Sequence, residues 1–168
     1  LSLEPLFPVT TSPYAEEGTR AHDLLERCLR DGVRRADIMT DDAELAAAAQ
    51  TYLDYVWPIL DTASTFAVEQ QVSMDIAGQA LYGTPDLVAE VGTRLVVIDY
   101  KHGAGVAVEA VGNRQLALYA LAYLPQAVND IETVELVIIQ PRARHVDGPI
   151  RRWEMSTVDL LDVRAEVE

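Results

Sequence analysis

The pattern of hydrophobic and polar positions predicts a helix near the start of the chain. Ser12 followed by Pro13 is typical of a helix start, because a serine hydroxyl can cap the first turn and proline fits the first helical position. Asp31-Gly32 is a turn signal, so the helix is expected to end at about Arg30. The intervening residues have the apolar spacing of one helix face.

A second helix is expected to begin at Asp41, because Glu44 stands three residues later as in a capping box. The helix continues through the alanine run at 46–49 to about Trp57, and Pro58 is expected to end it. Beyond this proline the hydrophobic period changes from helical to two, which indicates that strands follow.

The strand pattern covers most of the middle of the chain. Residues 66–76 alternate and predict one half-buried strand, and strands at 82–91 and 94–101 are joined by a tight turn at Gly92-Thr93. The later elements are a helix over 112–125 with Asn113 near its N-cap and Pro125 as its stop, a buried strand at 134–142, a short edge strand at 150–155 and a last helix from Ser156. This order predicts an α/β or α+β fold in which helices cover a sheet.

Composition limits the classes of protein that fit. The 168 residues suit a single domain over 1–168, and the only cysteine, Cys28, excludes an intrachain disulfide and a cysteine-bound iron–sulfur cluster. The sequence has no apolar segment of membrane-spanning length and no signal-peptide pattern, so a cytoplasmic protein is expected. The net charge of −14 argues against nucleic-acid binding and suits a cation or a basic protein partner.

The predicted hairpin brings charged residues together. With Gly92-Thr93 as a two-residue turn, Asp86 lies opposite Asp99, and Lys101 emerges on the same face. Two close carboxylates repel each other unless a cation lies between them, and hard oxygen ligands favour Mg²⁺ or Mn²⁺ over zinc. Lys101, the only lysine, could then hold a water or neutralise a phosphoryl oxygen. The alternative is an ordinary surface ion pair, since a D-x-K pattern is common by chance.

Other polar residues could complete such a site. His22 lies on the inward stripe of the first helix, with Glu26 one turn later, and an inward histidine is also a common core residue. Gln115 and Tyr119 are one turn apart on the later helix, and the plain interpretation is a surface amide and a buried tyrosine. Glu69 is a candidate for a further acid of the site, although simple solvation on the polar strand face is favoured.

Four short motifs occur in order along the chain: GTRAHDLLE, GTPD, DYK and QLALY. Together they resemble the RecB-like branch of the PD-(D/E)XK nuclease superfamily, with its motifs G-x-x-x-H-x-x-x-E, G-x-x-D, D-x-K and Q-x-x-x-Y. The stretch 97–124 is most similar to a phage- and prophage-borne family of uncharacterised RecB-like proteins. The resemblance runs from about Tyr14 to Tyr123.

The resemblance implies a restriction-endonuclease-like core, a mixed central sheet flanked by helices. The implied ligands of Mg²⁺ or Mn²⁺ are His22, Asp86, Asp99 and the backbone carbonyl of Tyr100. Lys101 would position and activate the hydrolytic water, Gln115 and Tyr119 would support the site, and Glu26 matches the family glutamate. The iron–sulfur members of this branch use four cysteines, so no cluster is expected here.

The resemblance further implies a DNA nuclease, with an exonuclease favoured, acting on ends or single strands in phage recombination or replication. A homo-oligomer or a phage recombination protein would be its partner. Because the chain is acidic, a local basic strip is expected to meet DNA, and its candidate members are Arg114, Arg142, Arg144, Arg151 and Arg152. Two other hypotheses stay open: a catalytically silent nuclease fold that binds proteins, and a metal-dependent hydrolase of small phosphate esters.

Overall fold

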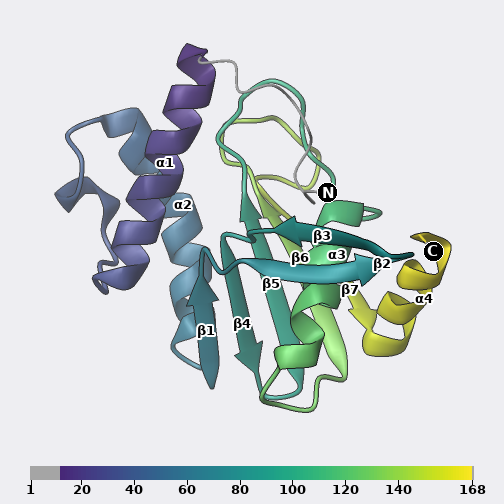
Figure 1. The fold of residues 1–168 in the computed structure, drawn as a ribbon. Coiled ribbons are helices and arrows are strands. Elements are labelled where there is room, and N and C mark those ends of the chain that lie inside the picture. The colour runs from purple at the N-terminus through teal and green to yellow at the C-terminus, as the bar shows by residue number, and fades with distance from the viewer. Residues whose placement is uncertain (1–11, 168) are drawn as a thin grey trace.

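The computed structural model describes residues 12–167 and arranges them around a five-stranded mixed sheet (Figure 1). The helical elements are α1 (Pro13–Arg30), η1 (Ala36–Ile38), α2 (Ala43–Leu60), α3 (Arg114–Tyr123), η2 (Leu124–Gln126) and α4 (Thr157–Val167). The strands are β1 (Thr65–Val68), β2 (Val72–Ile76), β3 (Gln79–Gly83), β4 (Leu87–Val91), β5 (Arg94–Tyr100), β6 (Thr133–Ile139) and β7 (Ile150–Ser156).

The sheet has the order β1-β4-β5-β6-β7, and only the pairing of β5 with β6 is parallel. Helix α3 connects these two parallel strands. Strands β2 and β3 pair only with each other and form a ribbon that crosses in front of α3 in Figure 1. This confirms the expected α+β fold, a mixed central sheet flanked by helices.

Alternation along β5 produces two cores. Val96, Ile98 and Tyr100 pack against α1 and α2, whereas Leu95 and Val97 pack on the α3 side. Both faces of β5 are therefore covered, which explains why its sequence is continuously hydrophobic. The first polar residues that a ligand can reach are those at the end of this strand, where the helices stop covering it.

The predicted start of α1 is confirmed: the hydroxyl of Ser12 accepts a hydrogen bond from the Ala15 N–H at 3.1 Å. The prediction for α2 was wrong at both ends. Asp42 rather than Asp41 is the N-cap, because its carboxylate reaches the N–H of Leu45 at 3.0 Å. The helix also continues past Pro58 to the buried Leu60, since a proline in the last turn removes only one helical hydrogen bond.

The predicted hairpin is confirmed, with Val91 opposite Arg94 and Leu87 opposite Ile98. One further step along this register places Asp86 beside Asp99. The turn residue Gly92 has a φ of 60°, a conformation that glycine adopts without strain.

The prediction of one strand over 66–76 was wrong. The strand ends at Val68, Glu69 adopts a left-handed φ of 50°, and the chain leaves the sheet to form the β2–β3 ribbon. The predicted strand at 82–91 is likewise divided, because β3 ends at Gly83 and β4 begins at Leu87. The inward side chains of the ribbon pack on the α3 core, so the apolar alternation resumes after an interruption in the backbone.

The remaining elements agree with the sequence. The side chain of Asn113 accepts a hydrogen bond from the Leu116 N–H at the start of α3, and Pro125 lies in the short helix that follows α3. β6 is buried, β7 is an edge strand, and the Ser156 hydroxyl accepts from the Asp159 N–H at the start of α4. None of the helices described between residues 12 and 167 has both the length and the apolar character to cross a membrane.

Candidate functional site

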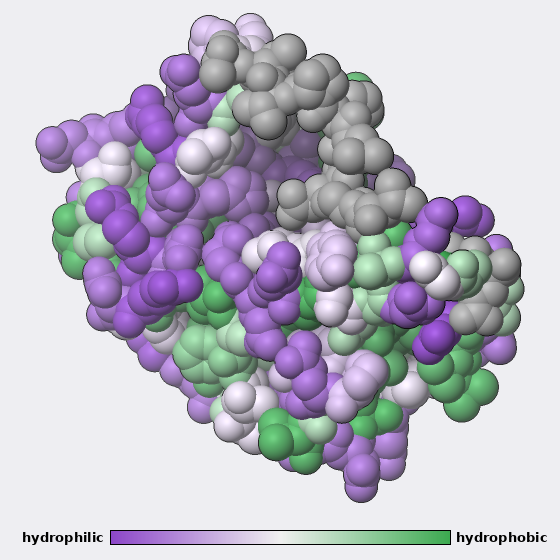
Figure 2. All heavy atoms as spheres, in the orientation of Figure 1, coloured by the Kyte–Doolittle hydropathy of each residue, from purple (hydrophilic) through white to green (hydrophobic). Residues whose placement is uncertain are grey.

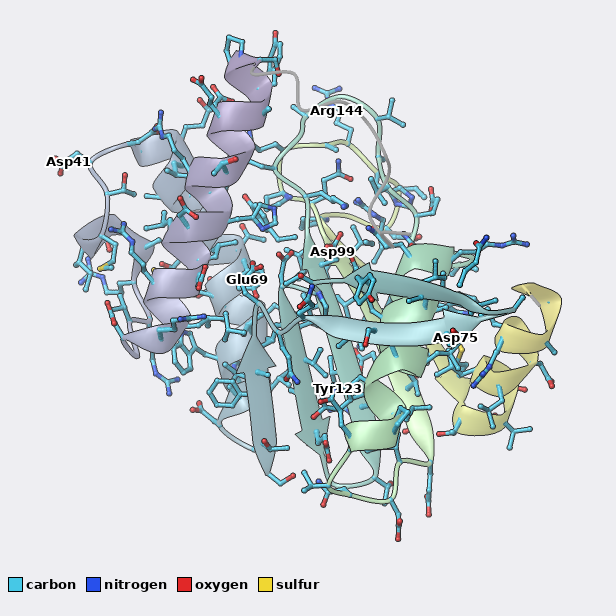
Figure 3. The ribbon with its side chains drawn as sticks, viewed as in Figure 1. Asp41, Glu69, Asp75, Asp99, Tyr123 and Arg144 are labelled. Atoms are coloured by element: carbon cyan, nitrogen blue, oxygen red, sulfur yellow. The ribbon has the colours of Figure 1, made fainter. Side chains whose placement is uncertain are left out.

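A cleft of about 470 Å³ opens where β5 ends, between α1, α3 and the base of the ribbon. Hydrophilic side chains dominate the surface beside α1 (Figure 2). In Figure 3, Glu69 lies at the base of the ribbon and Asp99 at the end of β5. The residues that line the cleft are Thr19, His22, Asp23, Glu26, Glu69, Thr84, Asp86, Asp99, Lys101, Gln115 and Tyr119. The predicted side chains of the site therefore meet in one place.

Asp86 joins α1 to the sheet at this cleft. His22 Nδ1 lies 2.8 Å from Asp86 Oδ1, and Asp86 Oδ2 accepts a hydrogen bond from the backbone N–H of Tyr100 at 2.6 Å. Burial would lower the pKa of His22, but the hydrogen bond to Asp86 and the negative charges of Asp86 and Asp99 outweigh it and raise the pKa. The hydrogen bond and the attraction to negative charge therefore both keep the His22 ring beside Asp86.

Asp99 and Lys101 form a second pair in the cleft. Lys101 Nζ lies 2.7 Å from Asp99 Oδ2, and this buried oxygen has no other hydrogen-bond donor among residues 12–167. Burial, followed by the charge of Asp86, raises the pKa of Asp99 to about 6, while Lys101 opposes this shift. Burial and the charge of Asp86 therefore disfavour the ionised form of Asp99, which a cation in the cleft would stabilise.

Glu69 is the residue that the sequence argument underrated. Its backbone N–H donates to the carbonyl of Asp86 at 3.0 Å, which closes the base of the ribbon and brings the two acids together. Burial, then the charge of Asp86 and a side-chain hydrogen bond with it, raises the pKa of Glu69 to about 8. The sequence contains one signal for this interruption of the strand. Gln70 occupies a position where strict alternation requires an apolar residue, which indicates a break between two strands.

The donor atoms at the cleft are arranged so that they can hold a metal ion. One ligand atom each from His22, Glu69 and Asp86 lies within 4.8 Å of the others. Two carboxylates and one imidazole suit a hard or borderline divalent cation, and a cation would relieve the repulsion that raises the pKa of Glu69 and Asp99. Asp99 stands outside this trio and pairs with Lys101.

The other predicted residues occupy the edges of the cleft. Gln115 Nε2 donates to the hydroxyl of Tyr119 at 3.1 Å on the face of α3 that borders the site. Glu26 lines the same cleft and lies 2.7 Å from Arg30 on the next turn. The side chain of Tyr100 points to the opposite face of the sheet, so only its backbone could take part, and its carbonyl remains a predicted ligand.

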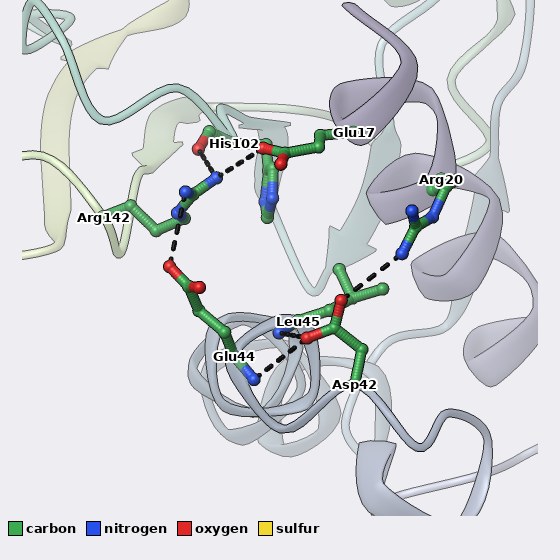
Figure 4. Close-up of a pocket in the computed structure, with 7 residues that line it drawn as sticks. All are labelled: Glu17, Arg20, Asp42, Glu44, Leu45, His102 and Arg142. Atoms are coloured by element: carbon green, nitrogen blue, oxygen red, sulfur yellow. Dashed lines mark hydrogen bonds and ion pairs between the residues drawn. The ribbon is translucent and has the colours of Figure 1, made fainter. Parts of the chain in front are cut away.

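The predicted basic strip was wrong. Arg151 is buried and donates to the carbonyl of Val108 at 2.8 Å, whereas its neighbour Arg152 is exposed and lies 3.7 Å from Glu135. Adjacent residues of a strand point to opposite faces, so these two arginines cannot form one surface. In the pocket of Figure 4, Arg142 lies between Glu17 and Glu44, which balance its charge.

The fold has a counterpart among crystal structures. A protein from Eubacterium rectale, described as a "putative exonuclease", matches 96% of this chain with a TM-score of 0.52 and 12% identity. This chain spans 66% of that protein, less than two thirds of its length. The likeness shows a shared fold.

Two further crystal structures are more distant. SSO0001 matches 95% of this chain, and this chain covers 79% of it, with a TM-score of 0.39 and 12% identity. Protein VC1899 from Vibrio cholerae matches 92% of this chain, which covers 51% of it, with a TM-score of 0.36 and 16% identity. At the level of sequence, the profile described as "Protein of unknown function (DUF2800)" matches residues 1–168, and the chain belongs to this family.

Proposed function

We propose that this protein is a divalent-metal-dependent DNA nuclease of the RecB-like PD-(D/E)XK type, with exonuclease action on ends or single strands. The observation that carries the proposal is the convergence of His22, Asp86, Asp99 and Lys101 in one cleft, from α1 and from two paired strands. The description of the Eubacterium rectale protein supports the same class of reaction. A role in phage recombination or replication, with a homo-oligomer or a recombination protein as partner, is part of the proposal.

The residues divide the work between holding the metal and preparing the water. His22, Asp86 and Asp99, with the carbonyl of Tyr100, would hold Mg²⁺ or Mn²⁺, and Glu69 lies close enough to His22 and Asp86 to add a carboxylate. When bound, the metal would supply positive charge that polarises the phosphodiester and makes a water more acidic.

Lys101 would hold the attacking water and offset negative charge on the phosphoryl group. Its ammonium is kept at the cleft by Asp99, 2.7 Å away. A lysine amine is a compact charge that can exchange a proton, whereas an arginine guanidinium stays protonated. Gln115 and Tyr119, linked at 3.1 Å, would orient the phosphate from the α3 side.

The test is cleavage of end-labelled linear DNA and closed circular DNA with Mn²⁺. Lys101→Ala is compared with Arg144→Ala, which also removes one cation but from an exposed position that does not line the cleft. We expect the wild type and Arg144→Ala to degrade linear DNA and Lys101→Ala to lose at least a hundredfold in rate. Nicking of the circle would change the assignment to an endonuclease, and equal rates for the two variants would remove Lys101 from the mechanism.

A second candidate is a catalytically silent fold that binds a basic protein, which the net charge of −14 favours. The two candidates differ in their response to metal. Mn²⁺ should raise the melting temperature of a nuclease, and Asp86→Asn should abolish this rise while the exposed Asp41→Asn leaves it unchanged. Absence of both the rise and any cleavage would favour the binding module.

A further inference from the structure

A second groove, of about 570 Å³, follows the outer side of α1. One wall carries Arg20, Arg27 and Arg30 of the helix, and the other is the segment that contains Met39 and Thr40. This groove lies outside the metal trio, and it shares Glu26 with the nuclease-like motif on α1.

The groove adjoins the candidate active site. Asp23 and Glu26 of α1 line both the groove and the cleft, so the exposed ridge of one helix separates the two. A linear ligand that extended from the cleft across this ridge would reach the arginines. The distance along the helix axis from Arg20 to Arg30 is about 15 Å at the usual rise of an α-helix.

The charge of the groove differs from that of the whole chain. Three arginines and two carboxylates line the groove, with Asp42 beside Arg20, whereas the protein as a whole has a net charge of −14. Arg27 forms no ion pair with any residue that the structure describes. It is therefore available to a ligand without the loss of an internal partner.

The other two arginines are paired weakly. Arg20 lies 3.3 Å from Asp42 and Arg30 lies 2.7 Å from Glu26, with the arginine side chains 62% and 59% exposed. Exposed pairs of this kind contribute little to stability, so a phosphate group can replace the carboxylate at little cost. Arginine is also the side chain whose donors best match phosphate oxygens.

We infer that this groove binds the phosphodiester backbone of one DNA strand whose reacting end lies in the cleft. The inference rests on the proposed nuclease function and adds the path of the substrate. A span of about 15 Å can accommodate a few consecutive phosphates of one strand. Arg27 is the central contact, and the binding depends on charge rather than on base sequence.

The experiment measures the affinity of a fluorescent 20-nucleotide single strand over a range of salt concentrations. All proteins carry Lys101→Ala, which retains the metal ligands, and Mn²⁺ is present. Arg27→Glu is compared with Arg144→Glu, because both reverse one exposed arginine and change the net charge equally. Arg27→Gln, which removes the charge without reversing it, is a second variant, and the Mn²⁺ stabilisation of each protein reports an intact fold.

We expect Arg27→Gln to weaken binding about tenfold and to reduce the slope of log affinity against log salt by roughly 1. Arg27→Glu should weaken binding further, and Arg144→Glu should have a small effect. Equal losses for Arg27→Glu and Arg144→Glu would overturn the inference, because the effect would then be that of net charge alone.

The experiments distinguish an error in the proposed DNA-binding groove from an error in the proposed nuclease function. Suppose that the protein with its native Lys101 degrades DNA, but Arg27→Glu and Arg144→Glu weaken DNA binding equally. Then only the proposed path of the strand along α1 is wrong. If that protein neither binds nor degrades DNA although Mn²⁺ stabilises it, the nuclease function is wrong and the groove loses its substrate.

Discussion

The backbone N–H of Glu69 donates to the carbonyl of Asp86 at 3.0 Å, and this bond closes the base of the β2–β3 ribbon. The residues between them form an excursion from the sheet that starts and ends at an acid of the cleft. The left-handed φ of Glu69, 50°, is what turns the chain out of β1. The ribbon therefore positions two acids that are distant in sequence.

Glu69→Gln is expected to weaken Mn²⁺ binding by about tenfold or more, because it removes a carboxylate from the trio with His22 and Asp86. Stability without metal should be unchanged or slightly higher, since the repulsion between Glu69 and Asp86 is removed. Titration calorimetry gives the affinity, and thermal unfolding gives the stability. Glu132→Gln, at an exposed position before β6, serves as the control. An unchanged affinity in Glu69→Gln would exclude Glu69 as a ligand.

Glu90 is a buried carboxylate with a structural role. It accepts hydrogen bonds from the Tyr123 hydroxyl at 2.8 Å and from the N–H groups of Val128 and Asn129 at 3.0 and 2.9 Å. Glu90→Gln should lower the free energy of unfolding by about 2–4 kcal/mol, because buried donors lose a charged acceptor. Urea unfolding at neutral pH measures the loss. A loss below about 0.5 kcal/mol would contradict this role.

The contribution of Glu90 should depend on pH. Burial by itself would raise the pKa of Glu90, but the hydrogen bonds from Tyr123, Val128 and Asn129 lower it below the usual 4.5. Ionised Glu90 therefore stabilises the native state above about pH 4.5, and this stabilisation is lost as the pH falls through the lower folded pKa. The stability difference between wild type and Glu90→Gln should narrow over that window. A constant difference down to low pH would rule out the linkage.

Arg151 is expected to hold the loop that follows Lys101. It donates to Val108 at 2.8 Å and to Gln140, and Gln140 in turn donates to the carbonyls of Gly103 and Val106 at 3.0 and 3.1 Å. Arg151→Lys should lower the free energy of unfolding by about 2–3 kcal/mol, because lysine cannot reproduce a directed fork of donors in a buried position. Urea unfolding gives this value.

Arg151→Lys also tests whether this buried network positions Lys101. The loop carries Lys101 at its start, so under the proposed nuclease function DNA cleavage should fall while Mn²⁺ affinity is kept. Arg152→Lys is the matched control on the same strand, because Arg152 is exposed. Equal effects of the two substitutions on unfolding and on cleavage would show that the buried network does not position the loop.

Gly18→Ala should stabilise the protein by about 0.5–1 kcal/mol. Gly18 lies inside α1, and an added Cβ would meet no atom within 4 Å beyond its chain neighbours and the adjacent backbone of its own helix. Alanine has the higher helix propensity and reduces the freedom of the unfolded chain. Thermal unfolding should show a rise of about 1–4 °C for a chain of this size. A fall in melting temperature would mean that the position is more crowded than the structure indicates.

Local signals were sufficient for much of the fold. The caps Ser12 and Asn113 are satisfied by side-chain hydrogen bonds within a few residues of themselves. The hairpin register depends only on the turn at Gly92-Thr93, so the position of Asp99 opposite Asp86 could be counted from the sequence. The N-cap of α2 is Asp42 instead of the predicted Asp41, because either aspartate can cap a helix and the choice depends on the geometry of the backbone.

The amino-acid sequence by itself determined where the main helices and the β4–β5 hairpin form and which charged residues the hairpin brings together, because these follow from hydrogen bonds and periodicities over a few residues. Only the tertiary structure decided that β1 pairs with β4 across an inserted ribbon, and that Glu69 therefore lies beside Asp86. It also decided that Arg151 is buried while Arg27 faces the groove beside the cleft. Such long-range pairings depend on the packing of segments distant in the chain, and no local pattern of residues specifies them.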